Sequence, residues 1–286
     1  MSAPRVSVLI PCHNREAYIR TCVESVLKQD FADFEIICSD NASTDGTWAI
    51  LQNLAARDPR VRIRRNETNL GPLPNWRCCL EEARGTWIHW LWSDDYVLPG
   101  FYSEMLSAME RRNAGVAVCP GTVLHEAKGG RLVPVFHRHP FEVRPGRRVA
   151  RGMLRFLCPW SWSPASWLLP AAAVRRHFYD ALPVAAGCDC NRSAAGCDLL
   201  LVTGCAWETA RVAYCPQALV VFRAHAGSIS VRTPGLWRHY EVAKIWALER
   251  WGFHRNPANR LGMVLRALVL GSLPLAWKVL AGRVVS

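Results

Sequence analysis

The chain has 286 residues, 50% of them hydrophobic and 20% charged, with a formal net charge of +12 at pH 7. This length is enough to bury a large α/β core, and the hydrophobic fraction excludes an intrinsically disordered protein. The N-terminus has no long apolar run, so we expect no signal peptide. The positive charge would suit nucleic acid, but the sequence shows no recognised nucleic-acid-binding motif, and we expect no nucleic-acid partner.

Strand-like and helix-like segments alternate over the first 120 residues. We predict strands at Val6–Ile10, Phe34–Cys38, Val61–Arg64, Thr86–Trp92 and Ala114–Cys119. Apolar spacing and helix-start signals predict helices at Glu16–Gln29, from Asp45 onwards, at Leu73–Ala83 and at Pro99–Arg111. This alternation favours an α/β fold with a mostly parallel, doubly wound sheet.

The second half of the chain is less regular. We interpret residues 125–155 as a long basic excursion, because its stretch 131–155 holds seven arginines and one acid, Glu142. Residues 185–195 are rich in small side chains, and we interpret them as a mobile loop. Later strands are predicted at Trp167–Leu169 and Ala218–Phe222.

Twelve cysteines raise the question of a disulfide scaffold, but the chain is long and many of them lie inside apolar patterns. We therefore expect reduced thiols, mostly in the core, and a cytoplasmic protein. Cys188, Cys190 and Cys197 leave a zinc site open as an alternative, although their spacing matches no standard zinc motif.

Three of the predicted strands end in polar residues of the kind that hold a ligand. The first is followed by Pro11 and His13, the second by Asp40, and the third by Asp94 and Asp95. In open α/β sheets, ligands bind beyond the carboxyl ends of the strands, so we predict one shared cleft. Two adjacent carboxylates repel each other unless a cation stabilises them, which predicts bound Mn²⁺ or Mg²⁺.

Four ordered segments resemble the inverting nucleotide-sugar glycosyltransferases of family 2, which have the GT-A fold. These segments are Val6–Asn14, Ser39–Gly46, Asn69–Trp76 and Ser93–Asp95. The resemblance is strong over about 1–125, fainter over 155–230 and absent after roughly 235. It implies a GT-A domain over 1–235, with a Rossmann-like nucleotide-sugar-binding half (1–120) and an acceptor half (121–235). Residues 236–286 would then form a helical, apolar and basic C-terminal tail.

The resemblance also assigns roles on the donor side. It places Pro11, His13 and Asp40 around the nucleotide base, Asn69 and Gly71 in the loop beside the nucleotide, Asp94 at the ribose and Asp95 on the metal. The residues alone leave open a turn cap for Asp40 and a structural role for His13. Many relatives have a further acid where this chain has Trp92, which leaves the division of labour between the two remaining carboxylates open.

On the acceptor side, the resemblance implies that Asp198 is the catalytic base. A helix cap is the alternative, and Asp189 is a second candidate for the base. Arg223 would hold the diphosphate, and His225 would hold the diphosphate or the metal, with structural roles open for both. Trp160 and Trp162 lie where relatives place acceptor-side residues, and core packing is their alternative.

The segment Leu261–Val285 is strongly apolar but is interrupted by Arg266, Pro274 and Lys278. A spanning helix needs about 20 mostly apolar residues, so we expect an in-plane or re-entrant membrane contact instead. A helix packed on the catalytic domain is the alternative.

The resemblance implies a metal-dependent inverting glycosyltransferase, and the positions of the carboxylates are consistent with that chemistry. The donor would be a nucleotide-diphospho-sugar, with a UDP-sugar favoured, and the acceptor a hydroxyl of a glycan or lipid-linked molecule in cell-surface polysaccharide or glycolipid biosynthesis. We expect a cytoplasmic protein, peripheral on the inner face of the cell membrane. Two alternatives are a catalytically silent glycan-binding scaffold on the same fold and a sugar-phosphate nucleotidyltransferase. The second should have a glycine- and basic-rich triphosphate loop, which the segment Pro11–Asn14 lacks.

Overall fold

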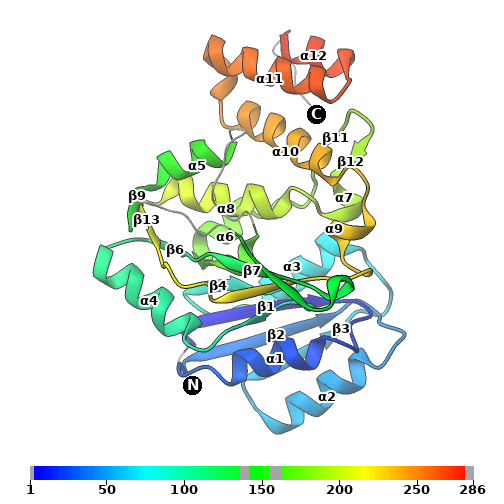
Figure 1. Cartoon of the computed structure of the whole chain (residues 1–286), viewed down its shortest axis with the longest axis vertical. Coiled ribbons are helices and arrows are strands. Elements are labelled where there is room, and N and C mark those ends of the chain that lie inside the picture. Colours follow the sequence, from blue (N-terminus) through cyan, green and yellow to red (C-terminus); the bar gives the residue numbers. More distant parts are fainter. Residues whose placement is uncertain (1–2, 136–141, 155–162, 281–286) are drawn as a thin grey trace.

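The computed structural model describes residues 3–135, 142–154 and 163–280, and its centre is a mixed eight-stranded sheet (Figure 1). The strand order is β3-β2-β1-β4-β10-β6-β13-β9. The strands are β1 (Val6–Cys12), β2 (Phe34–Asp40), β3 (Val61–Arg65), β4 (Trp87–Trp90), β6 (Val116–Val118), β9 (Val143–Pro145), β10 (Trp167–Pro170) and β13 (Arg211–Tyr214). β10 and β9 run against the direction of the other six, so the sheet is mostly parallel, as predicted.

Helices cover both faces of this sheet, because its central strands are apolar on both sides. Every residue of β1 and β2 is buried. Val8 belongs to the core formed with α1, α2 and α4, whereas Leu9 belongs to the core formed with α3, α6 and α8. The helices in question are α1 (Ile19–Leu27), α2 (Thr47–Arg57), α3 (Pro72–Glu82), α4 (Phe101–Arg112), α6 (Ala171–His177) and α8 (Cys197–Glu208).

A second sheet of four strands brings distant segments to the end of β4. Its order is β5-β14-β7-β8, formed by β5 (Tyr96–Val97), β14 (Val220–Ala224), β7 (Gly121–His125) and β8 (Arg131–Val135). β5 starts directly after Asp95 and pairs antiparallel with β14. The sequence patterns missed β5, β7 and β8, because β5 has only two residues and the other two strands are partly exposed.

Two regions that looked irregular in sequence contain ordered elements. The basic region holds η1 (Glu126–Lys128), β8, β9 and α5 (Gly146–Leu154). Residues 185–195 are not a simple loop: β11 (Val184–Ala185) pairs with β12 (Cys188–Asp189), and α7 (Cys190–Ser193) follows. The small side chains of this second region are the reason, since Cys188, Cys190 and Ala194 are buried in the core.

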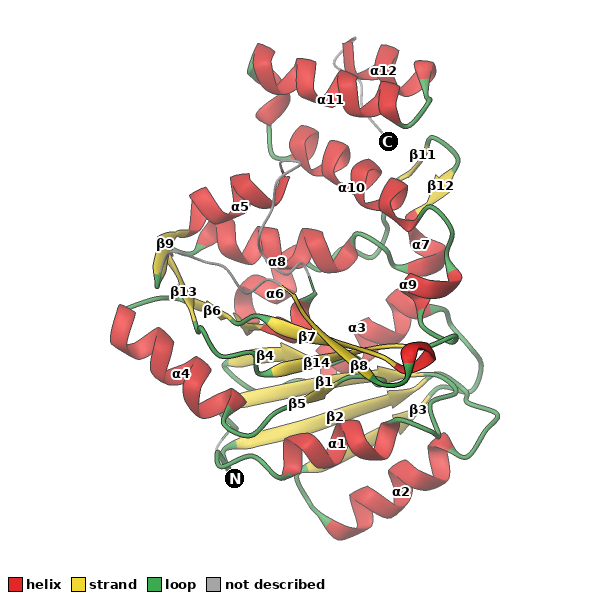
Figure 2. Ribbon diagram, in the orientation of Figure 1, coloured by secondary structure: helices red, strands yellow, loops and turns green. Residues whose placement is uncertain are grey.

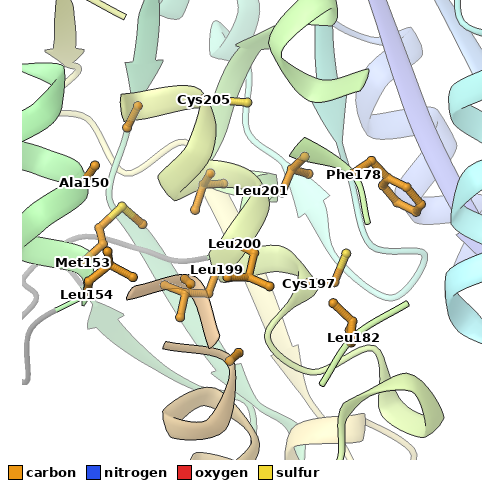
Figure 3. Close-up of a cluster of buried hydrophobic side chains, with 14 of the residues drawn as sticks. Ala150, Met153, Leu154, Phe178, Leu182, Cys197, Leu199, Leu200, Leu201 and Cys205 are labelled. Carbon is orange, nitrogen blue, oxygen red and sulfur yellow. The ribbon is translucent and has the colours of Figure 1, made fainter. Parts of the chain in front are cut away.

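α8 lies at the centre of the larger core. It is apolar on nearly all sides, as expected of a helix surrounded by other elements, and Leu199, Leu200 and Val202 are completely buried. Figure 3 shows its side chains between those of α5 and those of Phe178 and Leu182. The prediction that cysteines are mostly core residues agrees with this packing, because ten of the eleven unpaired cysteines in the described ranges are buried.

The last helices stack beyond α8, away from the central sheet (Figure 2). These helices are α10 (Leu236–Arg250), η3 (Phe253–Arg255), α11 (Pro257–Val269) and α12 (Leu273–Leu280). Two short helices lie earlier in the chain, η2 (Pro164–Ser166) and α9 (Ile229–Arg232). One side of α11 and α12 packs into the core through Met263, Ala267 and Leu275. No helix in the described part of the chain is long and apolar enough to cross a membrane. The end of the predicted tail, after residue 280, lies outside the described residues, as do Trp160 and Trp162.

Candidate functional site

The loop after β1 reaches both sides of the predicted cleft. The imidazole Nε2 of His13 lies 3.2 Å from Nδ2 of Asn69, and the guanidinium Nε of Arg15 lies 3.9 Å from Oδ2 of Asp94. Pro11 is buried within β1, opposite Ser39 of β2. One short loop therefore links the residues predicted beside the nucleotide with the acidic pair, Asp94 and Asp95. The sequence reasoning missed Arg15, although it directly follows the Pro11–Asn14 motif.

Asp40 is completely buried and is engaged by its own turn. It accepts hydrogen bonds from the backbone N–H of Ser43 at 3.3 Å and from the hydroxyl of Ser43. The Nε of Arg65 lies 3.2 Å from its Oδ2. These contacts match the alternative interpretation, in which Asp40 caps the turn after β2.

A network of asparagines fixes the 69–71 loop. Asn41 donates from Nδ2 to Oδ1 of Asn69 at 2.8 Å and to the carbonyl of Gly71 at 3.0 Å. Its Oδ1 accepts from Asn66, which also donates to Asn75. Gly71 has φ +83° and begins α3, which explains why the loop needs a glycine. Asn41 and Asn66 were missed from sequence, yet Asn41 follows Asp40 in the same motif.

The network also sets the proton of His13. Oδ1 of Asn69 accepts from Asn41 and from the N–H of Gly71, so its amide NH₂ faces His13. Nε2 of His13 must then be the acceptor, and the ring proton lies on Nδ1. That Nδ1 is buried and has no hydrogen-bond partner among the described residues. A donor of this kind is ready for an acceptor atom of a ligand.

Asp94 and Asp95 lie after β4 and differ in exposure. The side chain of Asp94 is 15% exposed, whereas Asp95 is buried. Burial, together with the neighbouring carboxylate of Asp94, raises the pKa of Asp95 well above its usual value. The backbone N–H of Arg223, on β14, donates to Oδ1 of Asp95 at 2.9 Å.

His225 faces Asp94 rather than open space. Its Nδ1 accepts the N–H of Gly227 at 3.1 Å, so its proton lies on Nε2 and is donated to Oδ2 of Asp94 at 2.9 Å. The ring also packs on Tyr18, with 4.4 Å between the ring centroids. The structure thus brings Asp94, predicted at the ribose, into direct contact with His225, predicted at the diphosphate or the metal.

Arg223 projects its guanidinium between two tyrosine rings. Its Cζ lies 5.3 Å from the ring centroid of Tyr18 and 5.1 Å from that of Tyr96. Its Nε is buried and makes no hydrogen bond within the described residues. Together with Arg15, it places positive charge beside the acidic pair.

A divalent cation fits the acidic pair in charge and donor type. Carboxylate oxygens are preferred ligands of Mg²⁺ and Mn²⁺, and a cation would relieve the repulsion that raises the pKa of Asp95. The described residues contain no group of three or more side chains arranged to hold a metal alone. A cation held by this pair would take its remaining ligands from water and from phosphate oxygens of a ligand.

Trp92, at the position where many relatives have an acidic residue, is part of the packing. Its indole Nε1 donates to the hydroxyl of Ser163 at 3.0 Å, and its ring lies 4.6 Å from that of Trp76. This side chain belongs to an aromatic cluster that also includes Trp90. Residue 92 therefore contributes packing, and the negative charge comes from Asp94 and Asp95.

Asp198 lies in the first turn of α8 and accepts hydrogen bonds on both oxygens. Oδ1 accepts the backbone N–H groups of Gly196 and Leu199 at 3.1 and 2.8 Å, and Oδ2 accepts the hydroxyl of Tyr240 at 2.7 Å. Burial nevertheless raises the pKa of Asp198 to about 6. A carboxylate with this pKa is mostly ionised at neutral pH and can still take up a proton.

Asp189 has a different environment from Asp198. It is exposed, and its Oδ1 accepts the backbone N–H of Asn191 at 3.0 Å at the start of α7. This is the geometry of a helix cap. Tyr240, which the sequence reasoning missed, contacts Asp198 from α10 across 42 positions in the sequence, and no local pattern signals such a contact.

Comparisons with known proteins show the family. The profile described as "Glycosyl transferase family 2" matches residues 7–162. A GalNAc(5)-diNAcBac-PP-undecaprenol beta-1,3-glucosyltransferase of Campylobacter jejuni is 35% identical over 127 residues, which cover 44% of this chain and 40% of the relative. A chondroitin synthase of Escherichia coli is 42% identical over 97 residues, covering 34% of this chain and 14% of the relative.

The fold also has a solved counterpart. The crystal structure of residues 1–349 of S. aureus TarS in complex with UDP-GlcNAc superposes with a TM-score of 0.66 and 16% sequence identity. The superposition covers 98% of this chain and 88% of that chain. At this identity the likeness concerns the fold. The two curated relatives named above are much longer than the segment they share with this chain, which spans 40% and 14% of their lengths.

Proposed function

Because the chain belongs to glycosyl transferase family 2 and has the GT-A fold, we propose that it transfers a sugar from a nucleotide-diphospho-sugar to an acceptor hydroxyl, with inversion. The observation that carries this proposal is the acidic pair Asp94–Asp95, which lies beside Arg15, Arg223 and His225. Such a mixture of carboxylates and guanidinium groups suits a diphosphate with its metal ion.

The donor's base and ribose would lie along the loops after β1 and β2. The free Nδ1–H of His13 offers a hydrogen bond, and the asparagine network holds the 69–71 loop at the same place. Asp40 would act here through the turn that it caps, with Pro11 forming the floor. We favour a UDP-sugar, in part because the TarS structures of similar fold are described with UDP and UDP-GlcNAc.

Asp95 and Asp94 would hold Mn²⁺ or Mg²⁺ with the diphosphate. When bound, this cation neutralises negative charge that builds on the leaving diphosphate. The chain's own contribution is to place the positive charges of Arg15 and Arg223 nearby and to orient the side chains around them. Arg223 is oriented by Tyr18 and Tyr96, and His225 donates its proton to Asp94 and so fixes the orientation of that carboxylate.

Asp198 would act as the general base. It takes the proton of the acceptor hydroxyl, whose oxygen forms a bond to the anomeric carbon while the bond to the diphosphate breaks on the opposite face. A base with a pKa of about 6 serves this purpose near neutral pH, because it is ionised before reaction and protonated afterwards. Tyr240 and two backbone N–H groups fix the orientation of the carboxylate.

We infer a glycan or lipid-linked acceptor in the assembly of a cell-surface polysaccharide or glycolipid. The name of the Campylobacter jejuni relative refers to an undecaprenol diphosphate-linked glycan, which supports this class of acceptor. An acceptor of this class would bring the protein to the inner face of the cell membrane.

The donor site is tested by calorimetric titration of UDP, GDP and dTDP into the full chain, with and without Mn²⁺. We expect metal-dependent binding of one nucleotide, and loss of that binding in Asp95→Asn. The matched control is Asp189→Asn, which changes an exposed helix cap and should bind like the wild type. If none of the three nucleotides binds in the presence of metal, the proposed function is wrong.

A further inference from the structure

The guanidinium group of Arg223 is oriented by two aromatic rings and by one carboxylate. Its Cζ lies 5.3 Å from the ring centroid of Tyr18 and 5.1 Å from that of Tyr96. Its Nη1 lies 3.8 Å from Oε1 of Glu126, which is too long for a hydrogen bond. Its Nε is buried and has no hydrogen-bond partner among the described residues. Arg223 is therefore held in place by attraction, while a buried donor of its side chain is left unsatisfied.

Arg15, the other arginine beside the acidic pair, is held in a different way. Its Nη1 donates to the carbonyl oxygens of His13 and Asn14 at 3.1 and 2.9 Å, so this side chain is tied to the backbone of its own loop. The guanidinium of Arg223 makes no such bond to the part of the chain that the structure describes. A backbone oxygen can leave only with its loop, whereas a side-chain carboxylate can rotate away. Of the two arginines, Arg223 is the one whose partner can be exchanged.

The pairing of β7 with β14 places Glu126 beside Arg223. The two strands are parallel, and Arg223 lies opposite Leu124. Glu126 follows Leu124 by two positions and is the first residue of η1. The side chain of Glu126 is 34% exposed, against 15% for Arg223. Water can therefore solvate this carboxylate when the arginine turns away from it.

Tyr18 gives Glu126 a second partner. Its hydroxyl donates to Oε2 of Glu126 at 3.1 Å. Burial and the neighbouring carboxylate of Glu126 raise the pKa of Tyr18, so this hydroxyl stays protonated and remains a donor at neutral pH. The ring of Tyr18 also packs on His225, with 4.4 Å between the ring centroids. Glu126 thus keeps a hydrogen bond and a fixed place when Arg223 leaves it.

We propose that Glu126 is a displaceable counter-ion of Arg223, which holds the guanidinium in the free protein and releases it to the diphosphate when the donor binds. A phosphate group can accept parallel hydrogen bonds from Nε and Nη of an arginine, whereas the carboxylate of Glu126 approaches one nitrogen at 3.8 Å. The reverse exchange returns Arg223 to Glu126 when the nucleoside diphosphate leaves. Glu126 is a positioning residue, because it acts through Arg223. This inference rests on the proposed function, in which a diphosphate lies at the acidic pair.

The test is calorimetric titration of inorganic pyrophosphate and of UDP into the full chain in the presence of Mn²⁺. Glu126→Gln should bind both ligands roughly three- to fivefold more tightly than the wild type, because no carboxylate then competes for Arg223. A gain in affinity is informative, since damage to the fold would weaken binding. The matched control is Glu24→Gln on α1, because Glu24 is also 34% exposed but lies beside Arg20 and Lys28. This variant should bind like the wild type.

A double-mutant cycle separates this exchange from a general effect of removing negative charge. In an Arg223→Gln background, Glu126→Gln should leave the affinity for pyrophosphate unchanged, because no guanidinium remains to be exchanged. The same gain with and without Arg223 would overturn the inference, as would equal affinities of Glu126→Gln and Glu24→Gln; the proposed function would stand in both cases. Pyrophosphate binding with the expected gain, but no binding of UDP, GDP or dTDP, would overturn the proposed function alone. A wild type that binds neither pyrophosphate nor any of these nucleotides would overturn both.

Discussion

Asp95 is buried and Asp198 is half-buried; both carboxylates have raised pKa values, and their surroundings differ. Asp95 lies beside a second carboxylate, Asp94, and accepts one backbone hydrogen bond from Arg223. Asp198 has three donors and, in the described part of the chain, no carboxylate next to it. The first environment favours a permanent cation, and the second favours a group that gains and loses a proton during reaction.

Glu241 extends this comparison, because its carboxylate is also buried but is surrounded by cations. Nζ of Lys244 lies 2.7 Å from one of its oxygens and Nε of Arg266 lies 3.4 Å from the other. Burial alone therefore does not define a functional carboxylate. The neighbours decide whether the group binds a cation, moves a proton or holds two helices together.

The largest expected effect separates Asp198 from Asp95. Asp198→Asn removes the general base but keeps the shape of the side chain, so we expect kcat to fall roughly 10²- to 10⁴-fold with little change in nucleotide affinity. Asp95→Asn should instead abolish metal-dependent nucleotide binding. Steady-state kinetics combined with calorimetry of UDP measure both. Loss of nucleotide binding in Asp198→Asn would show that the two carboxylates do not act separately.

A stability effect should separate Glu241 from exposed carboxylates. Glu241→Gln removes the buried negative charge that Lys244 and Arg266 both contact, so we expect the free energy of unfolding to fall by about 3 kcal/mol. The matched control is Glu24→Gln, whose partner Lys28 is 73% exposed, with an expected loss of less than about 1 kcal/mol. Urea unfolding of both variants measures the difference, and equal losses would contradict this account of the α10–α11 contact.

The comparison also explains how far the sequence could predict the molecule. The family, the GT-A fold class and the mostly parallel sheet are confirmed, since local periodicity and four short motifs carry that information. The turn after β2 and the 69–71 loop are built from neighbouring residues, so their motifs stood out. The residues that contact these segments from distant parts of the sequence could not be predicted from local patterns.

The contacts that orient Asp94 and Asp95 join residues far apart in the sequence. Arg223 reaches Asp95 across 128 positions and His225 reaches Asp94 across 131, because β14 pairs with the short strand β5. A two-residue strand has no periodicity to detect. The resemblance could single out these residues in the sequence, but the hydrogen bond between Nε2 of His225 and Asp94 follows only from the fold.

The smallest expected effect tests the environment of Asp198. The hydroxyl of Tyr240 donates to the ionised carboxylate and so lowers its pKa, against the larger upward effect of burial. Tyr240→Phe removes this bond, so the pKa of Asp198 should rise and the acid limb of the pH–rate profile should move to higher pH. The loss of rate should be a few-fold near pH 6 and smaller near pH 8. Tyr179→Phe is the control, because Tyr179 packs on Trp246, which lies on the same helix as Tyr240, α10. If Asp198 is the general base, the pH–rate profile of Tyr240→Phe should shift and that of Tyr179→Phe should not. If Tyr240 has only a structural role, Tyr240→Phe should lower the rate equally at every pH.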